Sequence, residues 1–125
     1  MRISIIVLLA VLSAGCSSRV AMDRYLDSAY EHYDRGDCNQ VLLALSQAER
    51  RSHPQDGLQP EISLLRGLCL ERQGLFVDAV ATYRFLLARY PTSEYGYRGR
   101  ARLETLRQLG HYKPDEAVWV QAAKR

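Results

Sequence analysis

The chain has 125 residues, of which 47% are hydrophobic, and a formal net charge of +3. This length is enough for one small domain. The first apolar segment, residues 3–12, follows a single positive charge at Arg2 and is too short for a permanent membrane-spanning helix. It has the form of a secretory signal, so we expect the folded domain to begin after it.

The end of this apolar segment carries a second pattern. Residues 12–15, with the sequence LSAG, directly precede Cys16. They resemble a bacterial lipoprotein signal, in which a diacylglycerol is attached to the cysteine and the chain is cleaved just before it. The resemblance implies a signal peptide over residues 1–15, a covalent lipid with palmitate-type acyl chains on Cys16, and no other cofactor. The alternative is an ordinary secretory signal that ends near a cysteine.

Residues 16–21 form a short tether in this interpretation. Ser17 stands where an aspartate would indicate retention in the inner membrane, so the resemblance implies the periplasmic face of the outer membrane. The six steps from Cys16 to Met22 span at most ~20 Å when fully extended. We therefore expect the helical domain, residues 22–125, to lie close to the lipid surface.

Residues 22–54 predict two amphipathic helices joined by a turn. Gly36 and Asp37 form the turn, and Asp37 with Gln40 fits a capping box at the start of the second helix. Apolar positions recur at helical spacing on both sides of this turn. They are Tyr25, Leu26, Ala29, Tyr30 and Tyr33 in the first helix and Val41, Leu42, Leu45 and Ala48 in the second.

Residues 60–93 repeat this organisation more clearly. Gly74 separates two predicted helices, and Pro91 ends the second one. The apolar positions are Ile62, Leu65, Leu68 and Cys69 in the first helix and Phe76, Val80, Tyr83, Leu87 and Tyr90 in the second.

The segment resembles the tetratricopeptide repeat, a helical hairpin of roughly 34 residues. Gly67 and Ala79 stand at the family's small positions, Tyr83 at its following aromatic position and Pro91 at its closing proline, with Gly74 in the turn. The resemblance implies an all-α fold, a short solenoid of about three hairpins. It also implies that Gly67 and Ala79 lie where the two helices of a hairpin touch.

Residues 94–125 predict a third, partial repeat that closes the array. A helix begins after Ser93 and runs to Leu109, with Leu103, Leu106 and either Gly99 or Ala101 facing inward. Gly110 repeats the turn. Pro114 suits the first position of a short last helix through Trp119 to Lys124, which resembles the cap of a repeat array.

The titratable residues do not form a catalytic or metal-binding pattern. His32, His53 and His111 fall in different segments, without metal-ligand spacing to one another or to a cysteine. The sequence therefore predicts a protein that is not an enzyme and binds no metal. Cys38 and Cys69 leave two alternatives open, because both fit inward positions as separate core thiols, whereas an oxidising periplasm would also allow a disulfide.

The repeat resemblance implies a concave groove lined by the first helix of each hairpin. Tyrosine and arginine, the types that dominate binding hot spots, are frequent there. The predicted partner-binding groove consists of Leu26, Tyr30, Tyr33, Leu64, Leu68, Arg72, Tyr97, Arg100 and Arg107.

These features predict a membrane-anchored, non-enzymatic adaptor that binds another envelope protein. The segment from Leu87 to Tyr95 is similar in repeat type to the lipoprotein subunit of the outer-membrane barrel-assembly machine and to small pilotin-like lipoproteins, which implies outer-membrane, secretion or pilus assembly. The chain has 15 arginines and two lysines. The alternative is therefore a binder of an anionic envelope polymer, peptidoglycan or lipopolysaccharide, through an arginine-rich face. Nucleic acid is not an expected partner of an exported protein.

Overall fold

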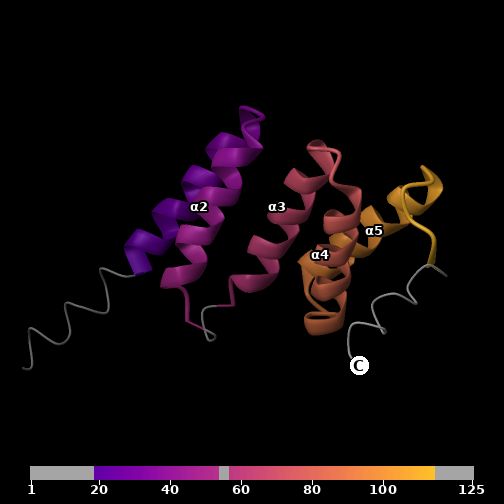
Figure 1. Ribbon diagram of the computed structural model, residues 1–125. Helices are drawn as coiled ribbons and strands as arrows, with labels where there is room; N and C mark the ends of the chain where they lie inside the picture. Colours follow the sequence, from indigo (N-terminus) through magenta and orange to yellow (C-terminus); the bar gives the residue numbers. More distant parts are fainter. Residues whose placement is uncertain (1–18, 54–56, 115–125) are drawn as a thin grey trace, which may run out of the picture. The chain divides into compact units, whose positions relative to one another are not determined.

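The computed structural model describes residues 19–53 and 57–114 (Figure 1). Over these residues the chain forms helices and connecting turns without any strand, which confirms the all-α prediction. None of the described helices is both long enough and apolar enough to cross a membrane. The predicted signal peptide, Cys16 and the last helix from residue 115 onward lie outside the described residues. The chain divides between Gln59 and Pro60 into two compact units.

The first unit contains a helix described over residues 19–34 and α2 (Cys38–Arg51). Both helices bury one apolar face, as their periodicity predicts. Tyr25 and Tyr33 are half-buried at the edge of this face, and Tyr30 is 37% exposed. The buried apolar residues of the unit are Met22, Leu26, Ala29, Cys38, Val41, Ala44, Leu45 and Ala48.

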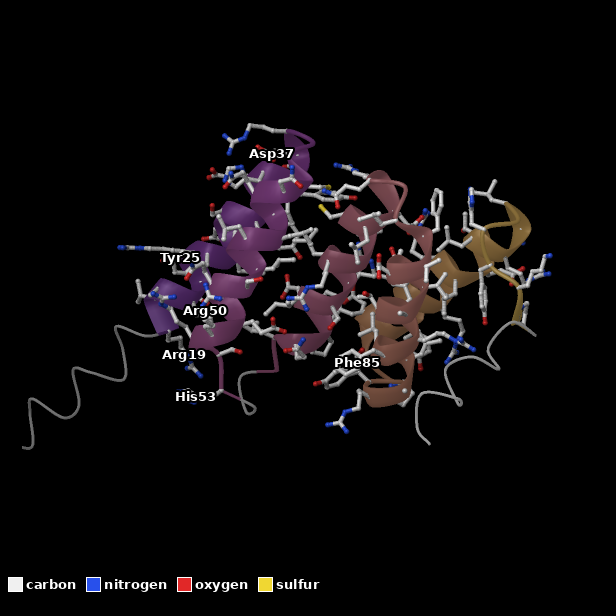
Figure 2. The ribbon with its side chains drawn as sticks, viewed as in Figure 1. Arg19, Tyr25, Asp37, Arg50, His53 and Phe85 are labelled. Atoms are coloured by element: carbon white, nitrogen blue, oxygen red, sulfur yellow. The ribbon has the colours of Figure 1, made fainter. Side chains whose placement is uncertain are left out.

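The predicted capping box at the start of α2 is half formed. The Gln40 backbone N–H donates to Asp37 Oδ1 at 3.2 Å, so Asp37 is the N-cap (labelled in Figure 2). In a full capping box the Gln40 side chain would accept from the Asp37 N–H. That N–H instead donates to the His32 carbonyl at 2.9 Å, which closes the preceding helix. Asp37 therefore terminates one helix with its backbone and starts the next with its side chain.

The second unit contains α3 (Gln59–Arg72), α4 (Phe76–Arg89) and α5 (Glu94–Gln108). Ser93 caps α5 by accepting from the Gly96 N–H at 2.9 Å. α4 packs against α5 and contributes four of the seven residues of the core cluster of the unit. This core cluster consists of Leu64, Ala79, Val80, Tyr83, Leu86, Leu103 and Leu106.

Close helix approach in the second unit depends on two glycines. A Cβ added to Gly67 on α3 would lie 2.8 Å from Cζ and 2.9 Å from Cδ1 of Tyr83 on α4. A Cβ added to Gly99 on α5 would lie 3.0 Å from Leu86 Cδ2 and 3.3 Å from Leu87 Cδ1, again on α4. Gly99 is buried whereas Ala101 is exposed, which decides between the two inward positions that the sequence allowed.

One turn geometry occurs three times along the chain. Gly36, Gly74 and Gly110 have φ angles of 79°, 74° and 79°. In each case the glycine N–H donates to the carbonyl three residues back, and the next N–H donates to the carbonyl five residues back. This is the Schellman motif, which satisfies the last carbonyls of a helix. The turns lie 38 and 36 residues apart (74 − 36 and 110 − 74). The described chain therefore ends just beyond a third copy of the turn that follows the first helix and α3.

Candidate functional site

A polar cluster of three side chains lies where the three helices of the second unit meet. Arg102 on α5 binds Glu71 on α3 with both prongs of its guanidinium, Nε to Oε2 at 2.9 Å and Nη2 to Oε1 at 2.6 Å. The hydroxyl of Tyr83 on α4 donates to Glu71 Oε2 at 2.5 Å. The Glu71 side chain is only 10% exposed and the Arg102 side chain 40%. The three side chains form one network, with Glu71 as the common acceptor.

The network fixes the protonation state of its members. Burial by itself raises the pKa of Glu71, but the hydrogen bonds from Arg102 and Tyr83 outweigh it and hold the pKa below the usual carboxyl value. Burial raises the pKa of Tyr83 well above that of a free phenol, and the Glu71 carboxylate raises it further. The hydrogen bond to Glu71 also raises the pKa of Arg102. The carboxylate is therefore ionised and both donors keep their protons at neutral pH.

The geometry makes this cluster a structural joint between helices. Both oxygens of Glu71 are occupied by donors from the protein itself, and Tyr83 is fully buried. Within residues 19–53 and 57–114, no three His, Cys, Asp or Glu side chains are grouped so that they could hold a metal ion. Sequence reasoning missed the cluster, because Glu71 and Arg102 are 31 residues apart and no local spacing connects them.

Two histidines have local contacts. The His111 ring stacks on Phe76 with a centroid separation of 3.7 Å and an interplanar angle of 15°. The neighbouring Tyr112 ring lies 5.5 Å from the guanidinium carbon of Arg84. His32 Nδ1 lies 3.2 Å from Arg35 Nη2. The His111 and Tyr112 contacts hold the turn after α5 against α4.

The predicted groove residues of the first unit differ in exposure. Leu26 is 9% exposed and belongs to the core, so it does not line a ligand-facing surface as predicted. Tyr30 is exposed and Tyr33 half-buried. Nearby, the guanidinium of Arg51 lies 4.7 Å from the centroid of the Tyr25 ring, a contact that the sequence did not suggest.

The predicted groove residues of the second unit also divide into core and surface. Leu64 is 4% exposed and packs in the core cluster, so it does not line the groove as predicted either. The reason is that α3 is buried around most of its circumference, so the face that carries Leu64 is not accessible to a ligand. Leu68 is half-buried and Arg72 exposed. Tyr97 is 57% exposed, and the guanidinium carbon of Arg100 lies 5.9 Å from its ring centroid.

The arginines of α5 are divided between ion pairs and solvent. Arg107 binds Glu104 with two hydrogen bonds of 2.6 and 2.8 Å, which lower the pKa of Glu104 to about 2. Arg102 is held by Glu71. Arg98 is 4.0 Å from Glu94, and both side chains are largely exposed. Two of the four arginines that crowd this helix are therefore committed to carboxylates of the chain itself.

The predicted structural residues are found in packed positions or turns. Ala79 and Tyr83 are fully buried, Gly67 contacts Tyr83, and Pro91 follows the residue that caps α4. Cys38 and Cys69 are both buried, and each is disulfide-bonded in the structure. Comparisons with family models, curated proteins and solved structures find no match to this chain.

Proposed function

We propose that this protein is a lipid-anchored, non-enzymatic adaptor that binds another envelope protein at the periplasmic face of the outer membrane. Its folded part, residues 22–125, is a tetratricopeptide-like solenoid of about three hairpins. The observation that carries this proposal is the threefold repetition of one helix-ending turn, at Gly36, Gly74 and Gly110. The recurrence of the same turn at similar intervals, 38 and 36 residues, is typical of arrays in which each repeat packs on its neighbours.

The exposed aromatic side chains supply the surfaces for a partner. Tyr97, with Arg100 beside its ring, presents a large amphipathic contact on α5. Tyr30 presents a second one on the first helix. Tyrosine and arginine give most binding energy per residue at protein interfaces, and an arginine on an aromatic ring is partly oriented before a partner arrives. Assembly of outer-membrane, secretion or pilus components is the process we expect this adaptor to serve.

Truncation of these aromatics should reduce recovery of the partner. Tyr97→Ala and Tyr30→Ala each remove a hot-spot type of side chain, and such truncations cost ~2 kcal/mol or more, about thirtyfold in affinity. The measurement is cross-linking in intact envelopes, followed by affinity recovery of this chain and identification of the attached proteins. Leu43→Ala is the matched control, because Leu43 is 53% exposed but lies on α2, outside the predicted surface. Equal recovery from all three variants would remove these surfaces from the proposal.

Salt separates protein binding from binding of an anionic polymer. Contacts between arginines and peptidoglycan or lipopolysaccharide should weaken steeply at moderate ionic strength, whereas contacts made by tyrosine should persist. The commitment of Arg102 and Arg107 to Glu71 and Glu104 favours the protein partner. Loss of the cross-linked product as salt rises would favour the polymer.

The anchor can be tested at Cys16. The short apolar segment and the LSAG sequence before this cysteine motivate a lipidated N-terminus. Cys16→Ala should leave the precursor uncleaved and without lipid, whereas the wild-type chain should incorporate labelled palmitate. Normal processing of the variant to a soluble periplasmic form would exclude the anchor and leave the partner-binding surfaces to be judged separately.

A further inference from the structure

Four exposed apolar residues form a stripe along the outward face of α4, with the half-buried Arg84 beside it. Val77, Ala81, Phe85 and Ala88 follow one another at steps of four, four and three residues, and all four are exposed. Val77 is 65% exposed and Phe85 45%. The opposite face of α4 carries the core residues, so this helix is apolar on two sides. A helix that covers a core normally presents polar side chains to water, and an apolar stripe there indicates an interaction surface.

Two opposite charges flank this stripe at its two ends. Asp78 and Arg89 are both exposed, and neither side chain forms an ion pair within the described part of the chain. They are eleven residues apart, which is close to three helical turns, so they lie on the same flank of α4. The midpoint between them falls between Tyr83 and Arg84 on the helix axis.

We propose that the outward face of α4 pairs with the same face of a second copy of this chain, with the two helices antiparallel across a twofold axis. A twofold axis at the midpoint brings Asp78 of one copy level with Arg89 of the other, and does so twice. The same axis brings Phe85 of one copy to within about 1.5 Å, measured along the helix, of Ala81 of the other, given the rise per residue. The large side chain then faces the small one in both halves of the interface.

Phe85 is already held in place for such a contact. Its ring meets the ring of Tyr90 edge to face, with centroids 6.4 Å apart and an interplanar angle of 74° (Phe85 is labelled in Figure 2). A side chain that is exposed but fixed loses little conformational freedom on binding, which favours an anchor role.

The charges of Asp78 and Arg89 favour a second copy of this chain as the partner. Only a helix with a basic and an acidic group in the reverse order matches this flank, and an antiparallel α4 is such a helix.

The test is the oligomeric state of charge-reversal variants. Sedimentation equilibrium of the protein extracted from envelopes in a density-matched non-ionic detergent should show a monomer–dimer equilibrium. Asp78→Arg and Arg89→Asp should each be monomeric alone, because each places like charges opposite one another in both halves. An equimolar mixture of the two variants should dimerise again, since both pairs then have opposite sign. Association through detergent micelles alone would be the same for every variant.

Phe85→Gln gives an independent measurement on the same interface. Loss of a buried aromatic anchor weakens binding at least tenfold, and the contact occurs twice, so dimerisation should weaken about a hundredfold. Circular dichroism should be unchanged, because Phe85 lies outside the core. A monomeric wild-type chain at all concentrations, or a dimer that none of these variants alters, would overturn the proposal. It would not affect the proposed adaptor function, on which this inference does not depend.

Discussion

Gly67→Ala should lower the free energy of unfolding by about 2 kcal/mol, since overpacking at a rigid contact costs up to ~3 kcal/mol and the gain in helix propensity returns only up to ~1 kcal/mol. The added methyl group would meet the ring of Tyr83, which is fully buried and whose hydroxyl is tied to Glu71. The ring therefore has no free direction in which to move. For a domain of this size we expect the melting temperature to fall by roughly 10 °C.

The control for this substitution is Ala101→Gly. Ala101 is exposed on α5, so its replacement reports helix propensity without any change in packing, a loss of about 1 kcal/mol. Thermal unfolding followed by circular dichroism measures both variants. If Gly67→Ala raised the midpoint, α3 and α4 would not approach as closely as the structure shows.

Glu71→Gln should destabilise the second unit by about 1–3 kcal/mol, because it weakens three charge-assisted hydrogen bonds and leaves an amide where Arg102 and Tyr83 both donate. The upper part of this range applies only if Arg102, whose side chain is 40% exposed, cannot turn to solvent. Chemical denaturation at neutral pH gives the free energy. Glu104→Gln is the matched control, since its pair with Arg107 lies on the exposed face of α5 and should contribute little.

The same carboxylate gives the stability a defined dependence on pH. The pKa of Glu71 is lower in the folded protein than in the unfolded chain, so the folded state binds its proton less readily. The stabilisation by the network is therefore fully present above the unfolded pKa of about 4.5 and is lost as the pH falls through the folded value. In Glu71→Gln this part of the acid sensitivity should disappear, so the difference in stability between variant and wild type should shrink below about pH 4. A difference independent of pH would show that Glu71 acts through packing alone.

The sequence predicted the elements that depend on local patterns. Helical periodicity, the Asp37 cap and the glycine turns located every described helix, and Gly67, Ala79 and Tyr83 lie in a packed contact. These features depend on residues within one or two turns of each other, or on a single hairpin.

The parts that the sequence did not predict depend on packing between distant elements. Leu86 is fully buried but stands beside the predicted stripe of α4, because this helix packs on both α3 and α5 and buries a wider arc than one stripe. Leu64 is buried rather than in the predicted groove, because α3 also buries more than one face. The pairing of Glu71 with Arg102 has no signal in a single sequence, since any exposed acid and base at that distance would look the same.

The glycines of this chain are constrained by two different properties of a side chain. At Gly36, Gly74 and Gly110 an added Cβ would meet nothing within 4 Å, and only the positive φ angle disfavours it. At these turns an L side chain is disfavoured by its handedness and not by its size, so a D-alanine would fit where an L-alanine is strained. Gly67 has an ordinary helical backbone, and it is the volume of an added Cβ that the ring of Tyr83 excludes. A neutral drift of the turns to asparagine is thus open to this fold, whereas any larger residue at Gly67 destabilises the contact between α3 and α4.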